Sequence, residues 1–245
     1  MTEERPEGPR GPERQEGALR VWTESILVAV ILLQFVNAFV LQTFFIPSGS
    51  MEDTLLVGDH LFVNRFIYGP PEPAGLGKWL PHRPVQRGDI VVFESVEEPG
   101  VDVIKRCVAV AGDTVELRGQ TLRINGEAID ESAYAIYREE PGDAEMDSRL
   151  RSFLQRKQSF PNTLVPPGHV FCLGDNRNHS NDSRFWGPLP LNHVEGRAWL
   201  IYWSYGGEGY ESEQQGLLPR IRRLLRTLVG LPTKTRWGRS FQVIR

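Results

Sequence analysis

The chain has 245 residues, enough for one domain of about 200 residues with a sizeable core plus a short additional segment. Lysine and arginine total 28 against 31 aspartate and glutamate, and the net charge of -3 excludes a strongly basic nucleic-acid-binding protein. Cys107 and Cys172 are too few for a disulfide-scaffolded fold.

The first 45 residues divide into a polar tail and an apolar segment. Residues 1–20 are rich in Pro, Gly, Glu and Arg and predict a disordered tail, because they have almost nothing to bury. Residues 25–45 carry no charge, and a helix of that length spans roughly the 30 Å core of a bilayer. We therefore expect a transmembrane helix over residues 21–45, with a buried core helix as the alternative. A cleavable signal peptide fits less well, since the apolar stretch is too long and no A-x-A site follows it.

The basic residues around this segment predict its orientation. Arg5, Arg10, Arg14 and Arg20 precede it, and the first basic residue after it is Arg65. Because Lys and Arg are retained on the cytoplasmic side, we expect a cytoplasmic N-terminus in the inner membrane. Residues 46–245 would then form an extracytoplasmic or periplasmic domain.

Short strands dominate the pattern after residue 46. They are rich in β-branched and aromatic residues, and Asn125-Gly126 between two of them is a hairpin signal. We expect a mainly β domain of antiparallel sheets with a few short helices. A long loop over 69–87 and a helix around 147–157 are also expected. The expected strands lie within residues 59–66, 89–95, 101–112, 114–119, 121–125, 169–175 and 197–205.

A turn rich in Pro and Gly follows the apolar segment and carries two hydroxyl groups. Residues 45–58 read FIPSGSMEDTLLVG, with Ser48 and Ser50 in the turn. A serine hydroxyl is a poor nucleophile until a base removes its proton. No histidine stands in a recognisable Ser-His-Asp context, so each is better explained as a loop or surface residue. The five histidines are His60, His82, His169, His179 and His193.

A lysine can replace histidine as the base if burial keeps its amine neutral. Lys105 lies in the apolar stretch DVIKRCVAVAG, whereas Lys78, Lys157 and Lys234 have polar or basic neighbours. Composition alone leaves open a lysine at a strand edge that points to water.

Residues 174–187 read GDNRNHSNDSRFWG and form a third polar block. Their spacing does not fit a calcium-binding EF-hand loop. One interpretation is a solvated turn with many bonds from side chains to backbone. The other is a loop that orients a catalytic amine through a hydroxyl and stiffens itself with an Asp–Arg pair.

The blocks PSGSM, RGDIVVF, KRCVAVAGD and GDNRNHSNDSRFWG, in this order after an apolar segment, resemble bacterial type I signal peptidase, or leader peptidase. This resemblance implies a membrane-anchored serine endopeptidase with a Ser/Lys dyad. Such an enzyme removes signal peptides from exported precursors, cuts after small residues of the A-x-A type, and uses no cofactor or metal. Its partners would be those signal peptides and membrane lipid, without nucleic acid, and it would function as a monomer.

The resemblance also assigns roles to individual residues. Ser50 matches the nucleophile and Lys105 the general base, while Ser48 and the backbone N–H of Ser50 match the oxyanion hole. Ser180 matches the serine that orients the lysine. The residues that match the bracing of the loop are Gly174, Asp175, Asp182 and Arg184. The residues that match the shallow substrate pockets are Phe44, Ile46, Pro47, Met51, Leu55, Val103 and Ile104.

The chain departs from the family pattern at three positions. Asp53 stands where the family often has Pro, which predicts a less rigid turn and a carboxylate that raises the pKa of the lysine. Asn178 and His179 replace residues of the family's common GDNRDNS. None of the three carries an assigned chemical role.

Other features stay open from sequence. Residues 216–232 form a basic amphipathic segment, either an interfacial helix or a helix packed on its own domain. Cys107 and Cys172 favour buried free thiols, with a disulfide as the alternative. A membrane-anchored scaffold domain would make Ser50 and Lys105 dispensable, and a specialised Ser/Lys processing enzyme is a nearer rival. A metalloprotease is disfavoured because H-E-x-x-H is absent.

Overall fold

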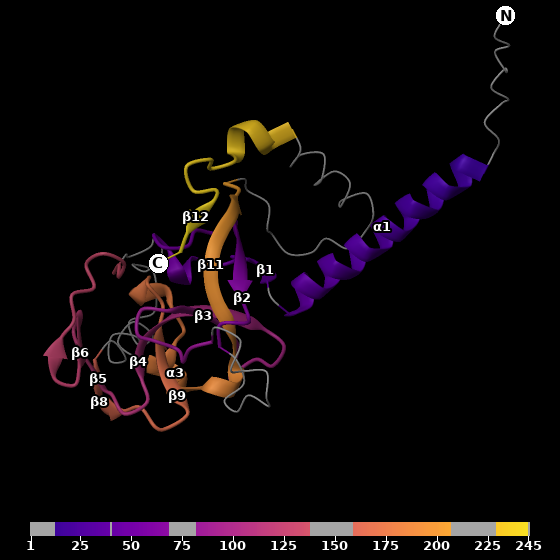
Figure 1. The fold of residues 1–245 in the computed structure, drawn as a ribbon. Helices are drawn as coiled ribbons and strands as arrows, with labels where there is room; N and C mark the ends of the chain where they lie inside the picture. The colour runs from indigo at the N-terminus through magenta and orange to yellow at the C-terminus, as the bar shows by residue number, and fades with distance from the viewer. Residues whose placement is uncertain (1–12, 40, 69–81, 138–158, 207–228, 245) are drawn as a thin grey trace, which may run out of the picture. The chain divides into compact units, whose positions relative to one another are not determined.

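The computed structural model describes residues 13–39, 41–68, 82–137, 159–206 and 229–244 (Figure 1). Outside them lie most of the expected tail, the expected helix around 147–157 and most of the amphipathic segment over 216–232. The chain forms two compact units, Met1–Val40 and Leu41–Arg245, which are described separately.

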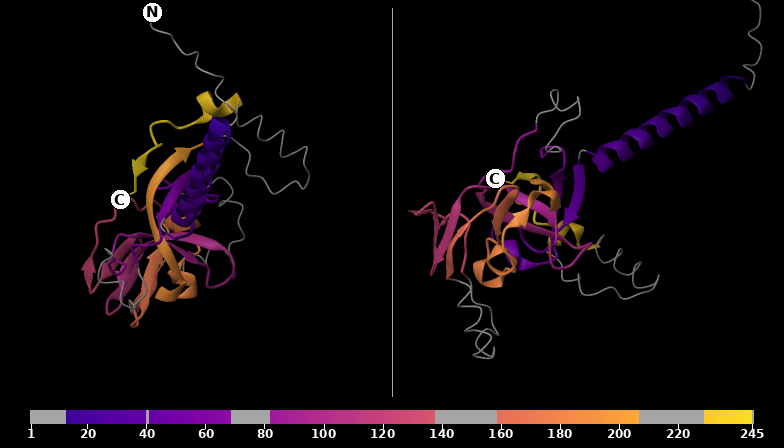
Figure 2. Two further views of the ribbon diagram at one scale, coloured as in Figure 1. Left: turned by 45° about the vertical axis from the view of Figure 1, so that its right-hand side comes forward. Right: turned by 90° about the horizontal axis from the view of Figure 1, so that it is seen from below.

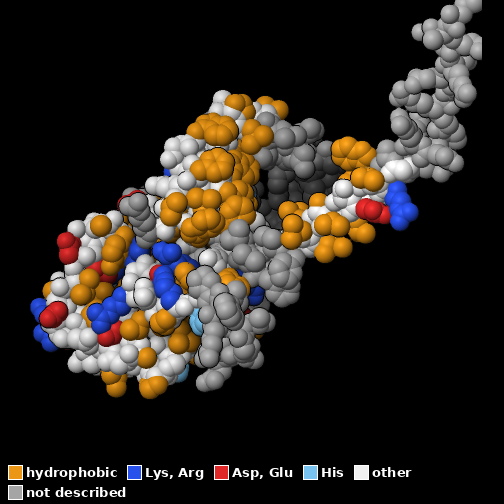
Figure 3. All heavy atoms as spheres, in the orientation of Figure 1, with side chains coloured by type: hydrophobic (Ala, Val, Ile, Leu, Met, Phe, Trp, Pro, Cys, Tyr) orange, Lys and Arg blue, Asp and Glu red, His pale blue; other side chains and the backbone are white. Residues whose placement is uncertain are grey.

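The first unit consists of helix α1, Glu13–Phe39. Its described side chains from residue 20 to residue 34 are all exposed, and apolar ones follow one another along it (Figure 3). Within the part of the chain that the structure describes, no helix is both long and apolar enough to cross a membrane.

The prediction of a disordered tail over residues 1–20 and a helix over residues 21–45 is wrong at both ends of the helix, because α1 already begins at Glu13 and ends at Phe39. Leu41–Phe45 is strand β1, and it pairs antiparallel with β2, Asp59–Asn64. The sequence LQTFF is apolar enough for either structure, but its Thr and Phe side chains favour a strand once a partner is available.

The second unit contains a large antiparallel sheet and a smaller one, as the mainly β prediction required (Figures 1 and 2). The large sheet has the order β1-β2-β11-β3-β4-β9-β10, and β12 pairs with β11. The smaller sheet has the order β7-β6-β5-β8. The remaining strands of the large sheet are β3 (Ile90–Glu94), β4 (Asp102–Val110), β9 (His169–Leu173), β10 (Leu189–Pro190), β11 (Val194–Ser204) and β12 (Gln242–Val243). The strands of the smaller sheet are β5 (Thr114–Arg118), β6 (Thr121–Ile124), β7 (Glu127–Ala128) and β8 (Phe160–Leu164).

The hairpin signal between β6 and β7 is confirmed. Asn125 has φ 53° and Gly126 has φ 83°, so both occupy the left-handed region that a two-residue hairpin turn needs. Short helical turns complete the fold. They include η1 (Gly49–Met51), η2 (Arg177–His179), α3 (Ser183–Trp186) and η3 (Leu191–His193), and the described residues 229–234 are helical as well.

A buried carboxylate ties three segments of the second unit together. Asp59, at the start of β2, is fully buried and accepts hydrogen bonds from Ser204 Oγ at 2.5 Å and Leu56 N at 2.9 Å. Arg239 Nη2 donates to the same carboxylate at 2.7 Å and to Thr54 O at 2.9 Å. The residues before β12 are thereby fixed against the loop that follows η1.

We expect Asp59→Ala to lower the free energy of unfolding by about 3 kcal/mol, because it leaves Arg239 without its buried partner. The measurement is urea-induced unfolding, monitored by tryptophan fluorescence. Glu127→Ala, at an exposed carboxylate on β7, is the matched control and should change stability by less than about 0.5 kcal/mol. Equal stability of the two variants would contradict the role given to Asp59.

Candidate active site

Ser50 is held in place by its buried neighbours along the chain. The loop over residues 46–58 is closed by two backbone hydrogen bonds, Ile46 N to Asp59 O at 2.9 Å and Gly58 N to Ile46 O at 3.0 Å. Within it, η1 presents Ser50, which is only 9% exposed, while Met51 has no exposed surface. Ser48 precedes η1 and is exposed.

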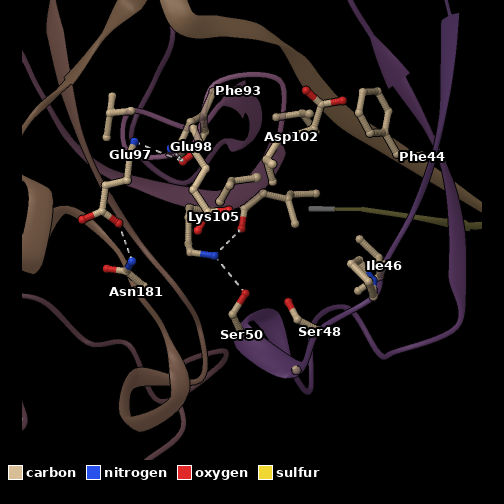
Figure 4. A pocket seen from close by; sticks show the side chains of 18 of the residues that line it. Phe44, Ile46, Ser48, Ser50, Phe93, Glu97, Glu98, Asp102, Lys105 and Asn181 are labelled. Atoms are coloured by element: carbon tan, nitrogen blue, oxygen red, sulfur yellow. Dashed lines mark hydrogen bonds between the residues drawn. The ribbon is translucent and has the colours of Figure 1, made fainter. Parts of the chain in front are cut away.

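Lys105 reaches Ser50 from the middle of β4. Its side chain is 4% exposed, and its Nζ donates to Ser50 Oγ at 2.8 Å and to Ile104 O at 3.0 Å (Figure 4). Figure 4 also shows the hydroxyl of Ser48 beside that of Ser50. The apolar neighbours of Lys105 along the strand thus correspond to a buried amine rather than one that points to water.

Burial changes the acid strength of this amine. Desolvation lowers the pKa of Lys105 to about 8, against the charges of Asp182 and Asp175, which raise it. A substantial fraction of the amine is therefore neutral near pH 8, and a neutral amine can accept a proton from Ser50 Oγ.

The loop over residues 174–187 contacts the backbone of Ser50. Asn176 N donates to Ser50 O at 3.1 Å. A Cβ on Gly174 would lie 2.6 Å from Ser50 O and 2.2 Å from Ser180 Oγ, both far inside van der Waals contact. Glycine at position 174 is therefore required for the loop to approach the serine backbone this closely.

Two of the bidentate ion pairs that stiffen this loop involve the carboxylates of Asp182 and Asp175. Arg184 donates from Nε and Nη2 to the Asp182 carboxylate at 2.8 and 2.9 Å, and Gly174 N donates to Asp182 Oδ2 at 3.0 Å. Arg106 donates from Nε and Nη2 to the Asp175 carboxylate, both at 2.8 Å. All four side chains are buried, so these ion pairs hold the backbone of the loop in place and are not surface salt bridges.

Ser180 does not make the contact expected of it. Its side chain is 6% exposed, yet its Oγ has no hydrogen-bond partner among the described residues. The Lys105 amine is held instead by Ser50 Oγ and Ile104 O. The Ser180 hydroxyl lies close against Gly174.

A cleft of about 420 Å³ opens above the Ser50–Lys105 pair. Apolar side chains from β1 and β4 line one part, and Glu97 and Asn181 lie near each other in another part, joined by a hydrogen bond of 2.6 Å (Figure 4). Among the described residues, no three His, Cys, Asp or Glu side chains are grouped so that they could hold a metal ion. The arrangement is suited to nucleophilic attack by a serine with an amine as its base.

A family model described as signal peptidase, peptidase S26, matches residues 19–203 of the chain. The chain belongs to this signal peptidase family. Signal peptidase I of Pseudomonas aeruginosa is 34% identical over 212 residues, which cover 78% of this chain and 75% of that protein. Signal peptidase I of Aquifex aeolicus is 28% identical over 260 residues, which cover 87% and 95%. The crystal structure of a signal peptidase I from Enterococcus faecalis V583 aligns at 32% identity over 47% of this chain and 97% of its own, with a TM-score of 0.33.

The pocket residues inferred from the signal peptidase family divide into two groups. Met51 and Leu55 were expected in the pockets but have no exposed surface, because they belong to the hydrophobic core under η1. They support the turn from below and do not line the cleft. The expected residues that do line it are Phe44, Ile46, Pro47, Val103 and Ile104.

Sequence reasoning overlooked Arg106 and Thr54. Thr54 Oγ1 donates to Asp175 Oδ2 at 2.6 Å, so the loop after η1 is tied to the pair of Asp175 with Arg106. The position of Arg106 could have indicated its role. It directly follows Lys105 in a predicted strand, so its side chain lies on the opposite face of β4.

Asp53, where the family often has Pro, occupies the left-handed region with φ 74°. Proline is locked near φ −65° and cannot adopt this conformation, whereas glycine adopts it freely. We expect Asp53→Pro to lose more than about 1 kcal/mol of stability, and Asp53→Gly to equal or exceed the parent protein. Chemical unfolding of both variants measures this. A proline variant as stable as the parent would show that the turn can be rebuilt.

Proposed function

We propose that this protein is a serine endopeptidase that removes signal peptides from exported precursor proteins, with Ser50 as nucleophile and Lys105 as general base. The observation that carries the proposal is the contact of 2.8 Å between Ser50 Oγ and the buried Lys105 Nζ at the floor of the cleft. Membership of the signal peptidase family gives the reaction class.

The reaction begins with a neutral Lys105, which accepts the proton of Ser50 Oγ as that oxygen attacks the scissile carbonyl. The tetrahedral oxyanion is stabilised by the Ser48 hydroxyl together with the backbone N–H of Ser50. The Lys105 ammonium then protonates the leaving amine, and an acyl-enzyme remains. A water molecule, deprotonated by the same amine, releases the signal peptide.

The edges of two strands suggest how the substrate binds. Within the described residues, β1 pairs only with β2, and residues 102–105 of β4 pair only with β3, since pairing with β9 begins at Arg106. An extended peptide can therefore add main-chain hydrogen bonds along these free edges. Phe44, Ile46 and Ile104 line the cleft with bulky apolar side chains, and we expect them to favour small residues before the cut, as in the A-x-A pattern.

We propose that this enzyme acts at the surface of a membrane. The exposed apolar side chains of α1 need an apolar environment. Apolar side chains also gather over β11 and residues 229–243, including Trp199, Trp237 and Phe241 (Figure 3). The proposed arrangement has residues 1–20 in the cytoplasm and the catalytic domain, residues 41–245, outside it, acting as a monomer.

Activity should rise with pH. Because the pKa of Lys105 is lowered to about 8, kcat/KM should increase about tenfold per unit below about pH 7 and level off above about pH 9. A pH series with one fluorogenic peptide measures this, with circular dichroism at each pH to confirm that the protein stays folded. A flat profile between about pH 6 and 9 would count against a titrating amine.

The function itself is tested by cleavage of a secretory precursor with an A-x-A site, using full-length protein in detergent and mass spectrometry of the product termini. We expect Ser50→Ala and Lys105→Ala each to reduce the rate at least about 1000-fold, because neither half of the dyad works alone. Ser132→Ala and Lys234→Ala, at exposed residues, are the matched controls and should cleave normally. Cleavage by the Ser50→Ala variant would contradict the proposed mechanism. A folded parent protein that does not cleave the precursor would point to a binding role.

A further inference from the structure

The two cysteines face each other across the strand pair that carries Lys105. β4 and β9 are antiparallel neighbours, and Cys107 is the register partner of Cys172. Both side chains are fully buried and belong to one hydrophobic cluster with Val91 and Val170. Two thiols from distant parts of the chain are thus brought to one point.

The pair occupies a position of the ladder where the strands exchange no hydrogen bond. Cys107 N donates to Asp89 O at 2.8 Å, and Cys107 O accepts from Gly88 N at 2.7 Å, so both groups point away from β9. Cys172 N donates to Ser183 Oγ at 2.9 Å, away from β4. At such positions the Cα atoms are about 4.5 Å apart, within the range of roughly 4.4–6.8 Å that a disulfide spans.

Both cysteines are buried free thiols in this structure, as the sequence favoured, and the two thiols interact in this reduced state. Burial, and next the hydrogen bond with the Cys107 thiol, raise the pKa of Cys172. Since only the thiolate exchanges with disulfides, buried thiols of this kind react slowly in the folded protein. The first exchange with the oxidant therefore takes place during folding, before β9 packs against β4 and buries both thiols.

We propose that Cys107 and Cys172 form a cross-strand disulfide that ties β4 to β9 beside the dyad. The oxidant is a disulfide: one cysteine thiolate attacks it to give a mixed disulfide and one free thiol. The second cysteine then attacks the mixed disulfide and releases the other thiol. Two S–H bonds are replaced by one S–S bond, and the oxidant is reduced to two thiols.

The bond would constrain the part of the sheet on which the reaction depends. Cys107 lies two residues after Lys105 and so shares its face of β4, while Cys172 lies two residues before Gly174. The disulfide also closes the loop of residues 108–171, which restricts the unfolded chain. The proposed extracytoplasmic location would supply the oxidant, but formation of the bond does not depend on protease activity.

The test uses the full chain, unfolded and reduced, then refolded in a glutathione redox buffer. Remaining thiols are alkylated under denaturing conditions, and intact mass and peptide mapping identify the products. We expect an unalkylated monomer with a peptide that links Cys107 to Cys172. Cys107→Ala is the control and should show one alkylated thiol at Cys172. Two alkylated thiols in the folded parent, or a link only between two chains, would overturn the proposal.

A melting experiment gives a second readout. The oxidised parent should melt roughly 5–15 °C above its reduced form, and Cys107→Ala/Cys172→Ala should show no dependence on reductant. An oxidised form that melts at or below the reduced one would show that the bond strains the sheet rather than stabilising it. Neither readout uses a substrate, so failure of the proposed protease function would be seen separately.

Discussion

The chemistry of this site depends on removing one amine from water. Lys105 is a strong base in solution and would be fully protonated at neutral pH, when it cannot accept a proton from a serine. Burial penalises the ammonium and lowers its pKa to about 8. The carboxylates of Asp182 and Asp175 oppose this effect, because their negative charges raise the pKa of the amine.

The two buried ion pairs reconcile these demands. The loop needs Asp182 and Asp175 to fix its backbone, because Asp182 accepts from Gly174 N and Asp175 accepts from Thr54 Oγ1. Each carboxylate is paired bidentately with an arginine, so the negative field that reaches the amine is reduced. The carboxylates can therefore serve as structural fasteners without cancelling the desolvation that makes Lys105 a base.

Much of this arrangement could be predicted from sequence, and the failures have physical causes. The pairing of Ser50 with Lys105 was expected from the resemblance to signal peptidases, because composition alone left open a Lys105 side chain that points to water. The end of α1 was not, since the period of LQTFF does not distinguish a helix from a strand whose partner lies elsewhere in the chain. Met51 and Leu55 were misplaced because an apolar residue beside a nucleophile can line a pocket or support it from below. Only the packing against Ile46 and Ile244 decides between these positions.

Contacts between distant segments also explain why the site cannot be separated from the fold. The position of Ser50 is set by the hydrophobic core beneath η1. That core includes Ile244, which lies about 200 residues further along the chain. Arg239 holds Thr54 O, and Thr54 Oγ1 holds Asp175, which pairs with Arg106 beside Lys105. A displacement of residues 239–244 would therefore reach both members of the dyad, one through the core and the other through these hydrogen bonds. The residues that perform the reaction are few, but their separation of 2.8 Å is set by segments from β1 to β12.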